Sequence, residues 1–179
     1  ENEKEQEKEL LDLPVLVVFD DQTCCESTVA TLQEIGIAGE WVLTGKEAVE
    51  RCAARHKTGR DYFAVILDWK MPEMDGIATA RRIRECVGED VTIIILTSFD
   101  FSEIEEEARA AGVNAFMAKP LFRSRLTATL RQFTSGKKEE NARNYLVDFA
   151  KENYAGKRIL LVEDNELNRE ITTEIIGMT

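Results

Sequence analysis

Four apolar segments of the sequence each end on a side chain that could take part in chemistry. These end residues are Asp20, Asp68, Thr97 and Lys119, and a second carboxylate, Asp21, follows the first. Carboxylates can bind a hard cation or act as nucleophiles, whereas an ammonium group and a hydroxyl can bind anionic oxygens. The four groups can work together only if the fold brings the ends of the segments to one place.

The elements that must position these residues alternate along the chain. Apolar segments typical of strands lie at 14–19, 40–43, 63–67, 91–96 and 113–118, and helical patterns lie at 24–35, 45–57, 76–87, 102–111 and 121–133. Five such units predict an α/β fold with a doubly wound, five-stranded parallel sheet and five flanking helices. Binding chemistry in such sheets collects at the carboxyl ends of the strands. We therefore expect the four side chains at one edge of the sheet.

Local signals predict where two of the helices begin. Asp75 directly precedes the helix at 76–87 and is a candidate N-cap. Ser102 and Glu105 have the spacing of a capping box at the start of the helix at 102–111.

The composition argues against several classes of protein. The net charge of -11 disfavours nucleic acid or an anionic membrane as a direct partner. No apolar run approaches the roughly 20 residues that a membrane-spanning helix needs. The acidic beginning is unlike a signal peptide, and we expect it to lie inside a longer protein. Reduced, unpaired cysteines, as in a cytoplasmic protein, are expected at Cys24, Cys25, Cys52 and Cys86.

Changes in composition divide the chain into four parts. A charged linker at 1–12 precedes a complete α/β domain at 13–134, and a linker helix is predicted at 135–156. Residues 157–179 repeat the opening pattern, with Asp164 at the position of Asp20. One strand and one helix bury too little to fold alone. We expect this segment to be disordered or to dock on a second molecule, as in a dimer formed by segment swapping.

Over roughly residues 12–134, the sequence resembles the response-regulator receiver (CheY-like) domain of two-component signalling. The shared motifs are Asp20 after the first strand, Asp68 followed by "WKMPEMDG", Thr97 after the fourth strand, and "KP" at Lys119. The resemblance implies a flavodoxin-like sheet with strand order 2-1-3-4-5. Because the repeat at 157–179 begins a second copy of the pattern, the chain also resembles part of a hybrid sensor histidine kinase with tandem receivers. The second of these receivers is truncated.

The resemblance also implies a role for each motif residue. Asp68 is expected to accept a phosphoryl group from a phosphohistidine, and Lys119 and Thr97 are expected to bind its oxygens. The donor is expected to be a histidine kinase or a phosphotransfer domain. This segment is then a self-phosphorylating switch and not an enzyme, although its parent chain is expected to be a kinase.

A magnesium ion is the expected cofactor, held by Asp20, Asp68 and the backbone carbonyl of Lys70. The sequence departs from the family at Phe19, where receivers usually carry a second acid. Losing that carboxylate should weaken magnesium binding. Asp21 is the alternative ligand, although a shift of one residue along a strand end reverses the direction of the side chain.

Two further residues, the aromatic Phe116 and the basic His56, need an interpretation. Phe116 is either a switch residue that moves inward together with Thr97 or a static core aromatic. His56, the only histidine, lies at a helix end without an acidic neighbour and is interpreted as a surface residue. The phosphodonor histidine must therefore lie elsewhere.

Two other functions compete with that of a phosphoaccepting receiver. The first is a degenerate receiver that binds partner proteins without phosphorylation, and Phe19 motivates it. The second is a phosphatase or phosphomutase of the haloacid-dehalogenase type. That class needs two aspartates flanking one residue after the first strand, which "FDDQ" does not provide.

Overall fold

The computed structural model describes residues 12–98, 104–134 and 160. The chain divides into two units, Glu1–Lys138 and Glu139–Thr179, and every described residue except Leu160 belongs to the first. The linker helix predicted at 135–156 and, apart from Leu160, the repeat predicted at 157–179 therefore lie outside the described residues.

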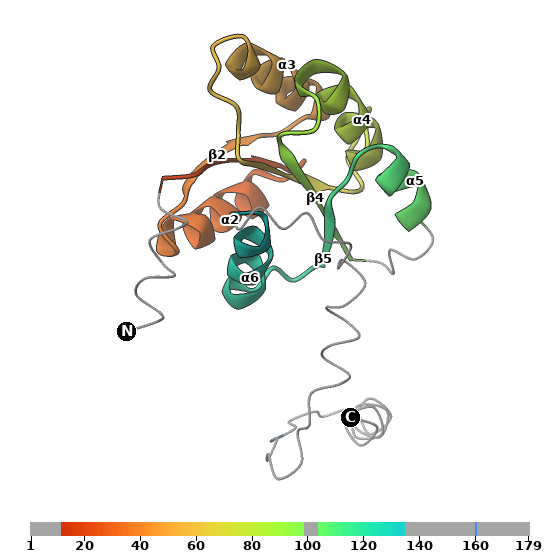
Figure 1. Cartoon of the computed structure of the whole chain (residues 1–179). Helices are drawn as coiled ribbons and strands as arrows, with labels where there is room; N and C mark the ends of the chain where they lie inside the picture. The colour runs from red at the N-terminus through yellow and green to blue at the C-terminus, as the bar shows by residue number, and fades with distance from the viewer. Residues whose placement is uncertain (1–11, 99–103, 135–159, 161–179) are drawn as a thin grey trace. The chain divides into compact units, whose positions relative to one another are not determined.

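Strands and helices alternate through the first unit, as the sequence predicts (Figure 1). The described strands are β1 (Pro14–Val18), β2 (Ala38–Val42), β3 (Ala64–Asp68), β4 (Thr92–Thr97) and β5 (Ala115–Ala118). The described helices are α2 (Gln22–Glu34), α3 (Gly45–His56), α4 (Gly76–Val87), α5 (Glu105–Ala110) and α6 (Arg123–Thr134).

The five strands form one parallel sheet in the order β2-β1-β3-β4-β5. Every connection runs through a helix, since neighbouring parallel strands need a crossover. The predicted fold class, a doubly wound sheet with five flanking helices, is confirmed. The least apolar strand, β2, lies at one edge, in agreement with the order 2-1-3-4-5 that the resemblance implies.

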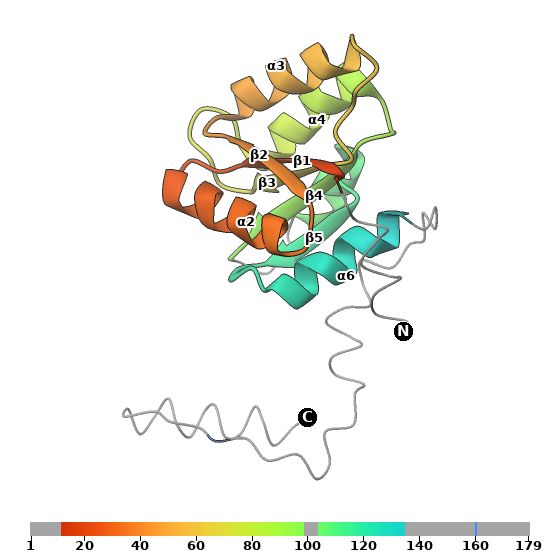
Figure 2. The same ribbon diagram turned by 90° about the vertical axis from the view of Figure 1, so that its left-hand side faces the viewer.

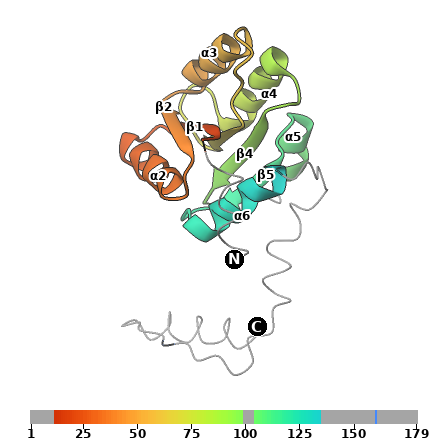
Figure 3. The same ribbon diagram turned by 60° about the vertical axis from the view of Figure 1, so that its left-hand side comes forward.

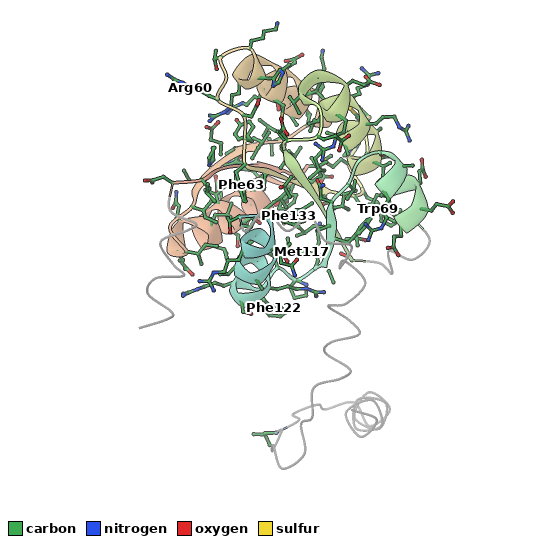
Figure 4. The ribbon with its side chains drawn as sticks, in the orientation of Figure 1. Arg60, Phe63, Trp69, Met117, Phe122 and Phe133 are labelled. Atoms are coloured by element: carbon green, nitrogen blue, oxygen red, sulfur yellow. The ribbon has the colours of Figure 1, made fainter. Side chains whose placement is uncertain are left out.

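Apolar side chains project from both faces of the sheet. A different set of helices covers each face (Figures 2 and 3). Val15 and Val17 of β1 point to the side of α2 and α6, whereas Leu16 and Val18 point to the side of α3, α4 and α5. Met117 of β5 belongs to the first of these two cores, and Phe133 of α6 packs against it (Figure 4). Strands covered on both sides explain why the sequence shows continuous apolar runs instead of alternation.

Side-chain caps fix the starts of the helices that follow the carboxyl ends of the strands. Asp75 accepts a hydrogen bond of 2.7 Å from the Ala78 N–H, which confirms the predicted N-cap of α4. Thr44 caps α3 in the same way through the Glu47 N–H, at 3.2 Å. The capping box predicted at Ser102 falls outside the described residues.

Arg84 of α4 ties the elements together at the amino-terminal edge of the sheet. Its Nε and Nη2 donate to the carbonyl of Gly112, at 3.0 and 2.8 Å, and Nη1 donates to the carbonyls of Gly88 and Val91. The remaining Nη2 bond goes to Asn114 Oδ1, at 2.7 Å. All five guanidinium N–H groups thus have acceptors, as a buried cation requires.

Gly76 lets the chain after β3 turn back closely over Asp68. Its N–H donates to the carbonyl of Trp69, at 2.8 Å. A Cβ at this position would lie 2.5 Å from the backbone oxygen of Asp68 and 3.1 Å from the Cα of Trp69. Because these neighbours are backbone atoms, they cannot rotate away. The backbone that carries Asp68 is therefore held by the start of α4.

We expect Gly76→Ala to lower the free energy of unfolding by about 1–3 kcal/mol, as overpacking of a filled site does. Urea unfolding measures this loss, and backbone amide NMR shifts should change around Asp68. Gly59→Ala is the matched control, because Gly59 lies in the turn after α3 and faces open space, with a φ of 64°. That variant carries a backbone cost alone and should leave the Asp68 amide signals in place. Unchanged signals in both variants would show that the turn tolerates a side chain.

Candidate functional site

The carboxylate of Asp68 and the ammonium of Lys119 meet at the carboxyl edge of the sheet. Asp68 is the last residue of β3, and Lys119 follows β5. Lys119 Nζ donates to Asp68 Oδ2 over 2.6 Å, although the two residues are 51 positions apart in sequence. The Asp68 side chain is 12% exposed and that of Lys119 is 32% exposed. The pair is therefore sheltered from water but still reachable from it.

Thr97 ends β4, the strand between the two that carry this pair. The residue is almost fully buried, at 1% exposure. Its carbonyl accepts a hydrogen bond of 2.8 Å from the Lys119 N–H, which fixes the backbone of the lysine beside it. A peptide bond in the cis form then links Lys119 to Pro120. The structure thus brings the chain at Thr97 and at Lys119 to the same edge as Asp68.

Asp20 and Asp21 follow the neighbouring strand β1, but their carboxylates have different surroundings. Asp21 accepts a hydrogen bond of 2.8 Å from the Cys24 N–H and is the N-cap of α2. This backbone hydrogen bond is the main cause that lowers the pKa of Asp21 below its ordinary value of 3.8. Asp20 is exposed, and among residues 12–98 and 104–134 its carboxylate has no hydrogen-bond or ion-pair partner.

The capping role of Asp21 was not predicted, because the helix expected at 24–35 begins later than α2, which begins at Gln22. An aspartate three positions before a backbone donor is a recognisable cap once the start is placed correctly. A carboxylate committed to the helix start is less available to a metal ion than that of Asp20.

Phe19 is turned into the core between β1 and the helices of the α2 and α6 face. It is 2% exposed and belongs to the same apolar cluster as Cys25, Leu96 and Met117. The Lys119 ammonium lies 5.4 Å from the centroid of its ring. Position 19, where the resemblance leads us to expect a second acid, is therefore occupied by an aromatic ring beside the lysine.

Two further predicted residues, Lys70 and Phe116, make contacts with other side chains. Lys70, whose carbonyl the sequence analysis proposed as a ligand, is exposed, and its ammonium lies 5.0 Å from the centroid of the Trp69 ring. Phe116 of β5 is 9% exposed and packs in the core of the α3, α4 and α5 face, with the Arg109 guanidinium 6.0 Å from its centroid. The static core position is thus the one this structure shows, and movement of the ring stays a prediction.

His56 lies at the end of α3, and helices end at the opposite edge of the sheet from the site. The expectation that it lacks an acidic neighbour is wrong. Its Nδ1 lies 3.1 Å from both carboxylate oxygens of Asp61, which the turn after α3 brings back to it. The side chain is exposed, in line with its interpretation as a surface residue.

The cysteines are free thiols, as expected for a reduced protein. Cys25 and Cys52 are buried, and Cys24 and Cys86 are exposed. Burial raises the pKa of Cys52 to about 12, so its thiol stays protonated and serves as a small apolar group.

Asp68 ends β3 and Asp20 follows the neighbouring parallel strand β1, so the topology brings both carboxylates to the same edge of the sheet. Within the described part of the chain, no group of three or more His, Cys, Asp or Glu side chains lies close enough together to hold a metal ion. Magnesium takes one or two protein carboxylates and keeps several waters. Asp20 and Asp68 therefore fit such an ion, with less negative charge than a third acid would provide.

Within residues 12–98 and 104–134, no helix is long and apolar enough to cross a membrane.

Comparisons with known proteins agree with the fold. Residues 15–131 match the response regulator receiver domain. Over 131 residues, the chain is 30% identical to the osmosensing histidine protein kinase SLN1 of Saccharomyces cerevisiae, a match that covers 73% of this chain and 11% of that protein. It is also 32% identical over 117 residues to the response regulator MprA of Mycolicibacterium vanbaalenii, covering 65% of this chain and 48% of that one.

Two solved receiver domains have the same fold. One is that of the sensor histidine kinase PA1611 from Pseudomonas aeruginosa, which holds a magnesium ion in its active site cleft; the TM-score is 0.61 with 28% identity, covering 69% of this chain and 98% of that one. The other is that of the histidine kinase CKI1 from Arabidopsis thaliana, in complex with Mg2+ and BeF3-; the TM-score is 0.64 with 28% identity, covering 73% and 95%.

This chain therefore belongs to the response regulator receiver domain family of two-component signalling. It spans only 11% of SLN1 and 8% of the hybrid signal transduction histidine kinase L of Dictyostelium discoideum, to which it is also similar.

We expect Asp21→Ala to lower the free energy of unfolding at neutral pH, because the start of α2 loses its cap. The folded-state pKa of Asp21 is lowered, so the stabilisation is present above about pH 4 and is lost as the pH falls through that pKa. Urea unfolding at neutral and at acid pH should therefore show a difference from the wild type that shrinks on acidification. Asp20→Ala, one residue away, removes a carboxylate without partners and should not lower stability. Equal losses in the two variants would argue against the cap.

Proposed function

We propose that this receiver takes a phosphoryl group from a phosphohistidine onto Asp68. In this step the bond between phosphorus and the histidine nitrogen breaks, a bond between phosphorus and a carboxylate oxygen of Asp68 forms, and the imidazole leaves. The observation that carries the proposal is the 2.6 Å contact between Lys119 and Asp68 at the carboxyl edge of a receiver fold. The donor is a histidine kinase or a phosphotransfer domain, because His56 lies at the other edge.

Each side chain at the edge has a task in this proposal. Lys119 binds one carboxylate oxygen of Asp68, and its ammonium neutralises the negative charge on the oxygens of the incoming phosphoryl group. The Thr97 hydroxyl hydrogen-bonds the phosphoryl group once it is attached to Asp68. Phe116 then changes position with Thr97 and alters the surface formed by α5, β5 and α6, where a partner protein reads the state of the switch.

Magnesium is the proposed cofactor, held by Asp20, Asp68 and the backbone carbonyl of Lys70. The ion supplies positive charge that offsets repulsion between the carboxylates and the phosphoryl oxygens. The support is the free carboxylate of Asp20 and the magnesium held by the receivers of PA1611 and CKI1. We infer weak binding, because Phe19 adds no charge to the site. Asp21 contributes at most indirectly, since its carboxylate caps α2.

We expect the protein to gain the mass of one phosphoryl group when it is mixed with magnesium and acetyl phosphate. Asp68→Asn should abolish this gain, because an amide is not a nucleophile of comparable strength. Intact-protein mass spectrometry measures the gain, and circular dichroism shows that the variant keeps its fold. The matched control is Asp75→Asn, which changes an aspartate near Asp68 that caps a helix and should still be labelled. Labelling that persists in Asp68→Asn would move the acceptor to another residue.

Phe19→Asp should tighten magnesium binding by roughly tenfold, because it adds a carboxylate ligand to a site with two. Phe19→Asn is the matched control, because asparagine is about as large and as polar as aspartate but carries no charge. Isothermal titration with magnesium compares the two folded variants with the wild type. If the affinities of both variants equal that of the wild type, water or Asp21 already supplies what the acid would add.

A degenerate receiver that binds partners without phosphorylation is the second candidate, and the buried Phe19 favours it. The acetyl phosphate experiment separates the two functions. Absence of any mass gain in the wild type, at magnesium concentrations that saturate binding, would favour the degenerate receiver.

We further propose that the chain is part of a cytoplasmic hybrid histidine kinase with tandem receivers. The support is its likeness to SLN1 and to the Dictyostelium hybrid kinase, together with the repeated motif that places Asp164 at the position of Asp20. In this proposal, residues 1–12 and 135–156 are linkers around the receiver at 13–134. Residues 157–179 begin the second receiver and are the part through which the separate chain would dimerise or swap.

A further inference from the structure

The Lys119 ammonium lies between two groups of very different chemistry. Asp68 Oδ2 accepts its hydrogen bond at 2.6 Å, and the centroid of the Phe19 ring is 5.4 Å from the same nitrogen. Among residues 12–98 and 104–134, Asp68 is the one carboxylate within ion-pair distance of this lysine. The ammonium therefore has one anionic partner and one aromatic partner.

The ring is fixed in its place by the core. Phe19 is 2% exposed and belongs to the same apolar cluster as Cys25, Leu96 and Met117. A cation within about 6 Å of a ring centroid is attracted by the negative face of the ring, and the attraction grows when water is excluded. The Lys119 side chain is 32% exposed, so part of this attraction is screened.

We propose that Phe19 is a positioning residue for Lys119. Its ring attracts the ammonium but offers no negative charge, so within the described part of the chain Asp68 remains the only carboxylate at which the ammonium is held. A carboxylate at position 19 would compete with Asp68 for the lysine and would also bind the metal ion. The ring does neither, and it therefore favours a resting state in which the lysine, not a cation, neutralises Asp68.

The placement of Lys119 can be tested without any phosphorylation. In the wild type, the ε-methylene protons of Lys119 should be shifted upfield by the ring, relative to those of exposed lysines such as Lys46. Phe19→Leu keeps an apolar core residue but removes the ring. The upfield shift should disappear, and ¹³C relaxation should show a more mobile ε-methylene group.

The chain offers a control in Phe63, which is partly buried and packs against the same apolar cluster (Figure 4). Phe63 precedes β3 and so lies at the amino-terminal edge, away from Lys119. Phe63→Leu makes the same chemical change and should leave the shift and mobility of the Lys119 ε-methylene group unchanged.

The effect on the reaction rests on the proposed function and is measured separately. With acetyl phosphate and saturating magnesium, Phe19→Leu should be phosphorylated about fivefold more slowly than the wild type, the factor that corresponds to an attraction of this kind. The magnesium concentration for half-maximal rate should stay the same, because the ring is not a ligand. Phe63→Leu should change neither quantity.

The outcomes distinguish the two proposals. If the wild type is not phosphorylated but Lys119 shows the upfield shift and loses its order in Phe19→Leu, the proposed function fails and the positioning role stands. If the wild-type Lys119 signal is not shifted, or if its mobility is equal in Phe19→Leu and in the wild type, the positioning role is overturned. This first measurement uses the wild type alone and so does not depend on the variants folding.

Discussion

In a sheet that is covered by helices on both faces, a polar side chain within a strand has no contact with water. In this protein, β3 and β4 are buried along their whole length, and β1 is buried beyond its first residue. A charged group within such a strand would have neither water nor a partner. In these three strands, polar residues are therefore confined to the ends. Because the strands are parallel, their carboxyl ends share one edge, and this constraint brings Asp68 to Lys119 across the intervening strand β4.

The same constraint explains how the structure around the pair is held. The loop after β3 folds closely over the Asp68 backbone because Gly76 has no side chain, and the Asp75 cap then starts α4 at once. On the other side, the Thr97 carbonyl holds the Lys119 N–H. The two charged side chains thus extend from backbone segments that are both fixed by hydrogen bonds. Little conformational entropy remains to be lost when they bind a ligand.

The sequence predicted the parts of the structure that follow from periodicity and from the rule for parallel sheets. These include the order of the elements, the doubly wound fold, the cap at Asp75 and the edge at which Asp68 and Lys119 lie. It did not predict contacts that depend on the direction of one side chain. The approach of Lys119 to the Phe19 ring depends on which way residue 19 turns at the end of β1. The contact of His56 with Asp61 depends on the turn after α3, and the cap at Asp21 depends on where α2 begins.

Arg84 shows a different kind of constraint, one on how the sequence can vary. Four of its five hydrogen bonds end on main-chain carbonyls, which every residue type provides, so Val91 can be exchanged for another apolar residue without loss of the bond. Gly112 cannot be exchanged in this way. It has a φ of 85°, and a Cβ there would lie 2.6 Å from the Arg84 Nε. The arginine and the glycine therefore form a linked pair, and relatives that lack the long guanidinium should be the ones that are free to carry asparagine or another side chain in place of the glycine.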